Sequence, residues 1–386
     1  MSVAIVHDWL DTWRGGENVL AEIVRLYPDA SLFALVDFLP DAMRANLLGK
    51  RATTSFLQWL PGARRYFRAL LPLFPRAIES LDVSAYGLVI SSSHAVAKGA
   101  RTTIGQVHIC YCHTPMRYAW DLREQYLHPL GLTSGLRGAL ANRVLDRLRD
   151  WDRRASARVT HFVANSEFVR DRIGRCYGRE AAVIHPPVDV GFFTPVEDAP
   201  EPAARDYYVT ASRWVPYKRV DLVVAAFREL PDRRLVVAGA GPAAHHVRAA
   251  AGPNVEFVGE VPRERLRELL RGARAFVFAA EEDFGILPVE AQACGTPVIA
   301  YGRGGSLETV RADGTDAATG MFFSAQTAGA IVDAVRRSDT ALSAIRAAAC
   351  RANATRFSAE RFRSEFAAFV DRALATSTVA DRQSVY

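Results

Sequence analysis

Two carboxylates, Glu282 and Glu290, flank a predicted turn that opens a helix, and the crowding of acidic residues there favours a polyhydroxylated ligand. They lie in the segment EEDFGILPVEA at residues 281–291. A pair of carboxylates can act as acid and base, or can accept hydrogen bonds from the hydroxyl groups of a ligand. Glu281 and Asp283 crowd the same loop, which is unfavourable unless hydroxyls, water or cations surround them. For Glu290 alone, stabilisation of a helix N-terminus is the competing explanation.

A basic pair, Arg213 and Lys218, could bind a diphosphate. Both follow the predicted strand 207–211 and lie in a proline-containing loop before a predicted helix at 220–230. An arginine offers two parallel N–H donors to phosphate oxygens, and a lysine offers a compact positive charge. Only three residues of the chain are lysines, and one of them is in this loop. Either residue taken alone would be an ordinary solvated side chain.

Glycine-rich turns follow several predicted strands, where backbone N–H groups could approach an anion. Gly15 and Gly16 precede a predicted helix, whose dipole would favour a phosphate. Gly239 and Gly241 follow a strand in the same way, and a third such loop occupies 302–306. Each turn could equally be a simple connection without a ligand. None of them is the GxGxxG dinucleotide fingerprint.

His113 lies at the end of the predicted strand 107–112. A histidine there can donate to a substrate oxygen or stabilise developing charge, whereas a structural role in the loop is the alternative. Cys112 beside it invites a metal site, but no CxxC or HxxxH pair completes a tetrahedral set, so no metal is expected. The five cysteines are scattered and odd in number, which favours buried thiols in a reducing compartment.

These residues need a scaffold that brings the ends of several strands together. Apolar runs alternate with amphipathic helical stretches along the chain, which is typical of α/β folds with parallel sheets, and ligands bind at the carboxyl edge of such sheets. In the acidic segment, Pro288 is expected as the first helical residue, with Glu290 in the first turn. The strands that we expect are 3–6, 88–91, 107–112, 159–164, 182–185, 207–211, 235–238, 255–258, 275–279 and 298–300.

Two successive α/β halves of similar size predict two Rossmann-like domains facing each other across a cleft. We expect an N-terminal domain at 1–190 and a second domain at 207–360. An acidic, proline-punctuated linker at 191–206 would join them. The C-terminal helix and tail at 361–386 could pack on either domain.

Length and composition indicate a globular enzyme. The 386 residues are 49% hydrophobic, so substantial cores can form, and the net charge of +6 favours an anionic partner. No uncharged apolar run reaches about 18 residues, and His7 and Asp8 come too early for a signal peptide. We therefore expect a cytoplasmic protein that does not span a membrane. Nucleic-acid binding has only the overall charge in its favour.

Taken together, these motifs resemble the family 4 retaining glycosyltransferases, which have the GT-B fold. The resemblance covers nearly the whole chain. It implies an α/β architecture of two Rossmann-like domains facing each other across a cleft, with the C-terminal helix crossing back to the N-terminal domain. The matching motifs are Glu282 and Glu290 followed by AQACGTPVIA, the pair Arg213 and Lys218, the loop Gly15-Gly16, Ala164-Asn165-Ser166, and HPPVD at 185–189.

The resemblance implies a role for each matched residue. Arg213 and Lys218 would hold the donor diphosphate, aided by the Gly16 backbone. Glu282 and His113 would contact the donor sugar, and Glu290 would bind the nucleotide ribose. The donor phosphate itself takes the acceptor proton in such enzymes, so no cofactor is expected and the glutamates are not acid and nucleophile. Further donor-binding positions are Gly15, Phe284, Gly285, Ile286, Leu287, Gly239, Gly241 and Val258.

Two segments resemble a bacterial subgroup, the mannosyltransferases that build O-antigen or exopolysaccharide. They are VHDWL at 6–10 and YCHTPMRYAWD at 111–121. This resemblance implies GDP-mannose as the donor and a lipid-linked saccharide or oligosaccharide as the acceptor, at the inner face of the cytoplasmic membrane. A UDP-hexose donor is one alternative, and a non-catalytic sugar-nucleotide or lipid-binding protein is another. An epimerase would need acid and base groups around the sugar, and the missing fingerprint disfavours an NAD-dependent dehydrogenase.

A basic and aromatic segment at 60–78 fits contact with an anionic membrane surface. It contains no acidic residue. Its arginines Arg64, Arg65, Arg68 and Arg76 alternate with aromatic and leucine side chains, as in interfacial segments. A core helix with a solvated arginine edge is the alternative.

Overall fold

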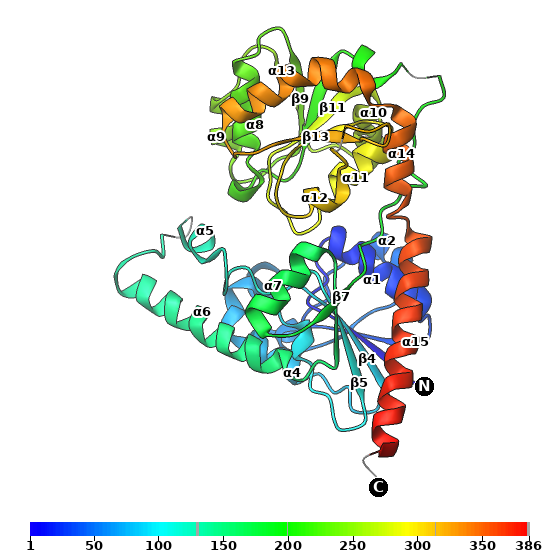
Figure 1. Cartoon of the computed structure of the whole chain (residues 1–386). Coiled ribbons are helices and arrows are strands. Elements are labelled where there is room, and N and C mark those ends of the chain that lie inside the picture. The colour runs from blue at the N-terminus through cyan, green and yellow to red at the C-terminus, as the bar shows by residue number, and fades with distance from the viewer. Residues whose placement is uncertain (129–130, 199, 313, 384–386) are drawn as a thin grey trace. The chain divides into compact units, whose positions relative to one another are not determined.

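The chain forms two compact units, each built around its own parallel β-sheet (Figure 1). The computed structural model describes residues 1–128, 131–198, 200–312 and 314–383. The first unit contains residues 1–187 together with the chain from 360 onward, and the second contains 188–359. Residues 191–206, the predicted linker, are grouped with the second unit.

The first sheet has the order β3-β2-β1-β4-β5-β6-β7 in the part of the chain that the structure describes. Its strands are β1 (Val3–His7), β2 (Ser31–Ala34), β3 (Thr53–Thr54), β4 (Leu88–Ser93), β5 (Val107–Cys112), β6 (His161–Ala164) and β7 (Ala181–Val183). Its helices are α1 (Gly15–Leu26), α2 (Asp41–Arg44), α3 (Ala63–Tyr66), α4 (Phe74–Glu79), α5 (Arg123–Leu127), α6 (Gly135–Ser156), α7 (Glu167–Tyr177) and α15 (Ala359–Gln383). Short 3-10 helices are η1 (Ala45–Leu47), η2 (Phe56–Trp59), η3 (Phe67–Leu73) and η4 (Ala97–Gly99).

The second sheet has the order β10-β9-β8-β11-β12-β13 among the described residues. Its strands are β8 (Tyr207–Ala211), β9 (Arg234–Ala238), β10 (Val255–Gly259), β11 (Ala273–Phe278), β12 (Val298–Tyr301) and β13 (Gly320–Phe323). Its helices are α8 (Val220–Arg228), α9 (Ala244–Ala249), α10 (Arg263–Gly272), α11 (Ile286–Ala293), α12 (Ser306–Thr309), α13 (Ala328–Ala344) and α14 (Ala347–Thr355). The 3-10 helices are η6 (Pro202–Ala204) and η7 (Pro216–Lys218).

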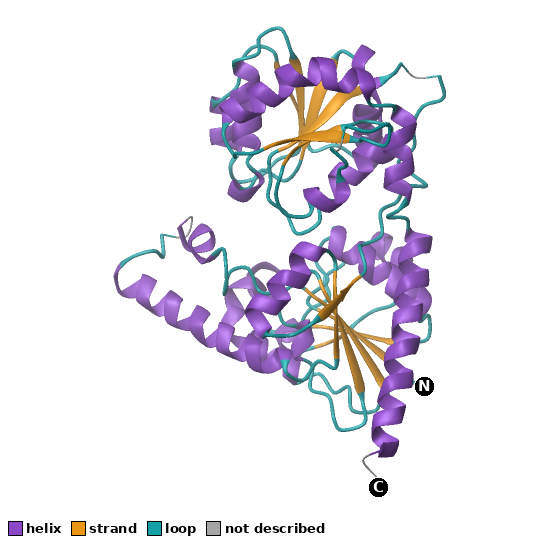
Figure 2. Ribbon diagram, in the orientation of Figure 1, coloured by secondary structure: helices purple, strands orange, loops and turns teal. Residues whose placement is uncertain are grey.

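Helices cover both faces of each sheet, which explains why every residue of central strands such as β4 and β5 is buried (Figure 2). In β1, the neighbours Ile5 and Val6 belong to two different core clusters because successive side chains point to opposite faces. In β8, Tyr208 and Val209 divide in the same way. All four side chains are buried. Each unit therefore has an apolar layer on both sides of its sheet.

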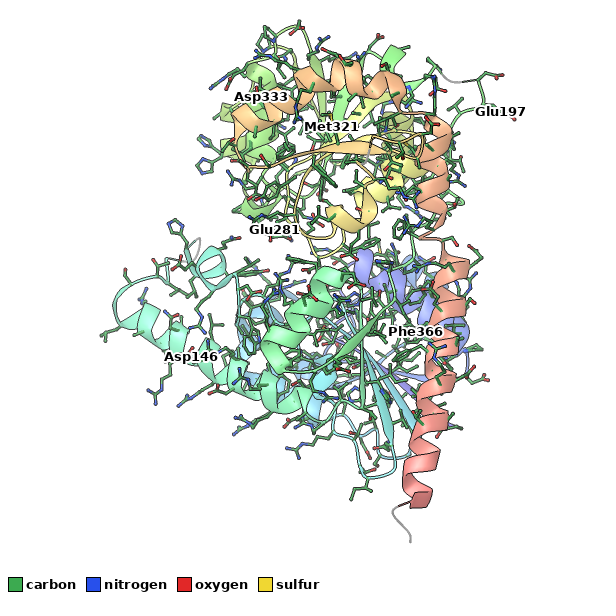
Figure 3. All side chains as sticks on the ribbon, in the orientation of Figure 1. Asp146, Glu197, Glu281, Met321, Asp333 and Phe366 are labelled. Atoms are coloured by element: carbon green, nitrogen blue, oxygen red, sulfur yellow. The ribbon has the colours of Figure 1, made fainter. Side chains whose placement is uncertain are left out.

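The C-terminal helix α15 belongs to the first unit. Phe362, Phe366 and Val370 are buried in the core cluster that also contains Ile5 and Leu88. In Figure 3, Phe366 marks the side of α15 that carries these residues. The helix thus returns to the first sheet after the chain has completed the second unit, as the resemblance implied.

In both sheets the order in which the chain adds strands reverses at the centre. In the first sheet the chain passes from β1 outward to β3 and returns with β4 beside β1. In the second it passes from β8 to β10 and returns with β11 beside β8. The loops after the two central strands diverge at such a point and leave room for a ligand at the carboxyl edge. The ends of β1, β4, β8 and β11 are therefore where the candidate side chains should be sought.

The expected strands are present, with ends shifted by at most a few residues. The largest shifts affect β4, which ends at Ser93, β6, which begins at His161, β7, which ends at Val183, and β11, which begins at Ala273. Three further strands, β2, β3 and β13, were not predicted because they are short and lie at or next to the edge of a sheet. All five cysteines are buried and free. None of the described helices is both long and apolar enough to span a bilayer.

Candidate functional site

The loop after β8 places two cations at the carboxyl edge of the second sheet. Arg213 follows the strand by two residues, is exposed, and forms no ion pair with a described carboxylate. Lys218 ends the short helix η7, and its Nζ donates to Oε1 of Glu282. Their side chains are only 18% exposed, so water screens the pair less than it would screen a surface ion pair. Two residues that the sequence assigned to one ligand are thus in contact.

Glu282 lies in the loop that joins β11 to α11. β11 is the strand beside β8 at the centre of the second sheet. Gly285 has a φ of +85° in this loop, a conformation that glycine adopts without strain, and α11 begins directly after it. No side chain caps this helix, and the N–H groups of Ile286 and Leu287 donate to no described acceptor. Figure 3 labels Glu281 on the same loop. The first turn of α11 therefore offers donors to the oxygen atoms of a ligand.

Two glycines after β9 allow a close approach of the backbone that any side chain would block. A Cβ on Gly239, whose φ is +113°, would lie 1.9 Å from the carbonyl oxygen of Ser212. A Cβ on Gly241 would lie 2.3 Å from the carbonyl oxygen of Trp214. Gly305 donates its N–H to the carbonyl of Glu282 over 2.8 Å. These contacts hold the loops after β8, β9 and β12 against their neighbours, whether or not a ligand is bound.

Val258 lies at the end of β10, next to the turn that contains Gly239. The N–H of Gly239 donates to the carbonyl of Gly259 over 2.7 Å. Val258 is half-buried and packs against the core cluster that contains Val236 and Ala238 of the neighbouring strand β9. The structure thus places this predicted donor contact beside the glycine turn that follows β9.

Glu290 is held in surroundings that disfavour its charged form. Burial raises the pKa of its carboxyl group, the Arg263 guanidinium lowers it, and Asp189 raises it, with a net value of about 7. Asp189 and Arg263 themselves form an ion pair of 2.8 Å. A carboxyl group that is half protonated near neutral pH, in a partly exposed position, is typical of a functional group.

The first unit brings His113 and the glycine loop together. A Cβ on Gly16 would lie 3.7 Å from Cε1 and Nε2 of His113, so the loop is in contact with the ring and has room beside it. Gly15 and Gly16 open α1, and their N–H groups donate to no acceptor that the structure describes. Burial lowers the pKa of His113 to about 3, and the neighbouring His94 and His7 contribute to the decrease. His113 is therefore neutral at physiological pH.

Asp8 and His94 form a pair at the same edge that sequence reasoning did not identify. The fully buried carboxylate of Asp8 accepts hydrogen bonds of 2.6 to 2.9 Å from the backbone N–H groups of His94, Ala95, Val96 and Ala97. Its Oδ2 lies 2.9 Å from Nδ1 of His94. Burial opposes ionisation of Asp8, but His94 outweighs it and holds the pKa of the carboxyl group well below its usual range. Asp8 in turn raises the pKa of His94 against the effect of burial.

Both halves of the chain match known protein families. Residues 13–192 match the model described as glycosyltransferase family 4, and residues 196–350 match the model described as glycosyl transferases group 1. The chain belongs to the family 4 glycosyltransferases. Together the two matches span most of its length, with one match in each unit.

Curated relatives of this glycosyltransferase match over part of its length. A D-inositol 3-phosphate glycosyltransferase of Mycobacterium sp. strain JLS is 30% identical over 241 residues, which are 54% of this chain and 53% of the relative. A GDP-mannose-dependent α-(1-6)-phosphatidylinositol monomannoside mannosyltransferase of Mycolicibacterium smegmatis is 34% identical over 208 residues, 46% of this chain and 52% of the relative. The chain thus spans about half the length of the curated relatives that it matches.

Solved structures confirm the GT-B fold of the glycosyltransferase. The crystal structure of Anabaena HepE in complex with UDP has a TM-score of 0.67 and 17% sequence identity. The likeness covers 96% of this chain and all of HepE. At that identity the likeness concerns the fold alone.

The start of α11 in the glycosyltransferase differs from the prediction. The helix begins at Ile286, so Pro288 is its third residue and Glu290 its fifth, in the second turn rather than the first. Gly285 causes the difference because its left-handed conformation lets the chain enter the helix two residues earlier. Glu290 is therefore too far along the helix for the dipole of the first turn to explain its position.

Within each unit of the glycosyltransferase the predicted residues gather at the carboxyl edge of the sheet. Lys218 and Glu282 are in contact in the second unit, and His113 and Gly16 are in contact in the first. Glu290 lies further along α11, and the charges that affect its pKa are those of Arg263 and Asp189. No three His, Cys, Asp or Glu side chains in the described part of the chain are placed to hold a metal ion. The site can thus offer positive charge, carboxylates and free N–H groups to a ligand.

Proposed function

We propose that the protein is a retaining hexosyltransferase that moves mannose from GDP-mannose to a lipid-linked or oligosaccharide acceptor in cell-surface polysaccharide synthesis. The observation that carries the proposal is the placement of Arg213 and Lys218 in the loop after β8, with Lys218 in contact with the carboxylate of Glu282 after β11. A diphosphate needs the two cations, and a sugar hydroxyl needs the carboxylate. The strand order reverses between β8 and β11, and the carboxyl ends of these two strands leave space for the diphosphate and the sugar.

In the proposed reaction the protein supplies charge and position rather than a nucleophile. The bond between the anomeric carbon and the donor phosphate oxygen breaks, and an acceptor hydroxyl oxygen bonds to the same face of that carbon. The acceptor proton passes to the departing phosphate. Because the acceptor attacks the face that the phosphate leaves, the configuration at the anomeric carbon is retained. Negative charge grows on the diphosphate during this step, so Arg213 and Lys218 would stabilise the transition state more than the bound donor.

The ion pair between Lys218 and Glu282 has a consequence for donor binding. Each side chain neutralises the other in the free protein. A bound donor would give Lys218 a diphosphate and Glu282 a hydroxyl group in exchange, so each side chain would keep a hydrogen-bond partner. The pair therefore keeps both groups in place before the donor arrives, which lowers the entropy cost of ordering them.

The nucleotide and the sugar of the donor are the finer part of the proposal. The mycobacterial relative is named as GDP-mannose-dependent, which favours GDP-mannose, whereas HepE was solved with UDP. Ligand-induced thermal shifts with GDP-mannose, GDP-glucose, UDP-glucose and UDP-galactose distinguish them, with ATP as the control nucleotide. We expect GDP-mannose to raise Tm most, because a ligand that binds only the folded state stabilises it. A larger shift with a UDP-hexose would contradict the donor assignment.

A sugar-nucleotide-binding protein without transferase activity is the second candidate function. The same set of nucleotide sugars, together with an assay of GDP release, tests it. Such a protein would show the same thermal shift with GDP-mannose but would release no GDP on incubation with acceptor. Release of GDP that requires a membrane extract supports transfer. Binding with no GDP release in any extract would favour the non-catalytic alternative.

The acceptor side of the proposal includes contact with an anionic membrane surface. Arg64, Arg65, Arg68 and Arg76 are exposed, and Trp59 is 81% exposed nearby in sequence. The two phenylalanines of the segment, Phe67 and Phe74, are buried in the core of the first unit and are not available to a membrane. The segment is thus a packed element with an arginine edge, and its arginines remain as the proposed contact.

Reversal of these four arginines to glutamate tests the membrane contact. We expect the variant to lose co-sedimentation with vesicles that contain anionic lipid, because each basic residue near such a surface contributes about 1 kcal/mol. The reversal of Arg51, an exposed arginine outside the segment, provides the control. Unchanged co-sedimentation of the fourfold variant would show that the edge is only a solvated surface.

A further inference from the structure

His94 lies directly after β4, at the carboxyl edge of the first sheet, and only one of its ring nitrogens is paired. Its Nδ1 lies 2.9 Å from Oδ2 of Asp8, whereas its Nε2 forms no hydrogen bond with a described residue. The side chain of His94 is 34% exposed although that of Asp8 is fully buried. The ring can therefore contact a ligand on one side while Asp8 holds it on the other.

Buried charges fix the loop that carries His94 from two sides. On one side, the Asp8 carboxylate accepts the four consecutive N–H groups of residues 94–97. On the other side, the fully buried Lys98 donates to a carbonyl of this loop over 2.6 Å and pairs with the buried Asp152 of α6 at 2.6 Å. A buried charge is costly unless its partners keep their places, so these contacts determine the path of the loop. His94 is thus positioned before any ligand arrives.

The charged groups around His94 favour the protonated form of its ring. Burial lowers the pKa of His94, but the carboxylates of Asp8 and Glu17 raise it by more. Lys98 opposes this increase in pKa without cancelling it. The backbone N–H groups disperse the charge of Asp8, whereas the exposed part of the His94 ring faces solvent. An anion that approaches the ring therefore meets a positive charge.

Two other histidine rings and a tryptophan border His94. Its ring centre lies 6.2 Å from that of His7 and 6.4 Å from that of His113. The Trp9 ring lies 4.5 Å away, and the guanidinium of Arg68, itself paired with a carboxylate, lies 6.0 Å from the Trp9 ring. His94 is therefore next to the residue that is proposed to contact the donor sugar.

We propose that Asp8 and His94 form an anion-binding subsite of the first unit, in which Asp8 positions the ring and Nε2–H of His94 donates to a phosphate oxygen of a substrate. The phosphate can belong to the donor diphosphate or to the carrier of a lipid-linked acceptor, and both present the same chemistry. A histidinium ring forms a charge-assisted hydrogen bond with such an oxygen. The identity of the substrates rests on the proposed function, whereas the anion subsite does not.

An NMR titration of the full chain with ¹⁵N-labelled histidine tests the subsite without turnover. His94→Gln assigns the signals of His94. We expect its titration midpoint to lie above about 6.5, the ordinary value for histidine, and to rise further with a diphosphate that binds beside the ring. A rise with GDP assigns the phosphate to the donor, and a rise with farnesyl diphosphate assigns it to the acceptor carrier. Guanosine and farnesol are the uncharged controls, and a midpoint that neither diphosphate raises would overturn the proposal.

Asp8→Asn tests the positioning role of the carboxylate. Asparagine keeps an oxygen for the backbone N–H groups but removes the charge beside His94, so we expect the titration midpoint of His94 to fall below its wild-type value. An unchanged midpoint would show that Asp8 does not stabilise the charged ring. If this variant does not fold, the wild-type titration with the two diphosphates still decides whether the subsite exists.

Binding to the His94→Gln variant provides the functional measurement. Glutamine can still donate a hydrogen bond but carries no charge, so we expect about tenfold weaker binding of the diphosphate that raises the midpoint. His128→Gln, which replaces an exposed histidine of the same unit, should bind it as the wild type does. Equal affinities of the two variants would contradict the subsite, even if the protein transfers sugar. If His94 binds phosphate but no sugar is transferred, the proposed function fails while the subsite stands.

Discussion

Lys218→Ala should lower kcat by about two orders of magnitude, the scale on which losing a charge contact to the transition state acts. The expectation follows from the position of Lys218 in the loop after β8. Its Nζ donates to Glu282 in the loop after the neighbouring strand β11. Removing it also leaves the Glu282 carboxylate without its cation. The donor KM should change less than kcat, because the charge on the diphosphate is greatest in the transition state.

Arg219→Asn is the control for charge in the same loop. Arg219 follows Lys218 directly, pairs with Asp221, and has a φ of 53°, which asparagine tolerates better than most residues. Both substitutions remove one positive charge, but only Lys218 contacts the acidic loop. Initial rates of GDP release measure the two variants side by side. A Lys218→Ala enzyme with a kcat near that of Arg219→Asn would rule out the role proposed for Lys218.

Glu290→Gln should stabilise the second unit at pH 8 and weaken donor binding at the same pH. The pKa of Glu290 is raised from 4.5 to about 7, so the folded protein binds this proton more tightly than the unfolded chain does. The carboxyl group therefore costs no stability below about pH 4.5, an increasing amount as pH rises toward 7, and its full cost above that. With one pKa unit equivalent to 1.36 kcal/mol and the side chain still partly exposed, we expect about 1 to 2 kcal/mol.

Chemical denaturation at pH 4.5 and pH 8 measures the stability part of this prediction. The difference between Glu290→Gln and wild type should be small at the lower pH and largest at the higher one. Glu281→Gln is the control, since Glu281 is an exposed carboxylate of the loop before α11. A stabilisation that is equal at both pH values would show that Glu290 does not titrate as described. Unchanged affinity for the donor nucleotide would argue against a ribose contact.

The strands that the sequence predicts well are those whose side chains are buried on both faces. Runs such as 107–112 and 207–211 are mostly apolar because helices cover both sides of the sheet, and their bounds agree with the structure. β3 has two residues, and β13 lies at the edge of the second sheet. Such segments carry too few apolar residues to be recognised without their neighbours. Local pattern therefore predicts the centre of each sheet better than its margins.

The parts of the site that the sequence could not predict depend on contacts between distant residues. Asp8 was visible after the first strand, but the N–H group of His94 that it accepts from is 86 positions away. Ser92 joins His7 and His113 in the same way, and no local motif marks it. The order of the strands would have been a usable signal, because β4 lies beside β1 and brings the residues after both strands together. By contrast, the acidic loop and the basic pair are continuous in sequence and were recognised directly.

The configuration of the transferred sugar tests the account most directly. The protein is incubated with GDP-mannose and a bacterial membrane extract that contains lipid-linked saccharides, and NMR determines the anomeric configuration of the new linkage. The account predicts GDP release together with an α-linked mannosyl product, because the acceptor attacks the face from which the diphosphate departs. A β-linked product would contradict the proposed mechanism, and the absence of any mannosyl product would contradict the proposed donor.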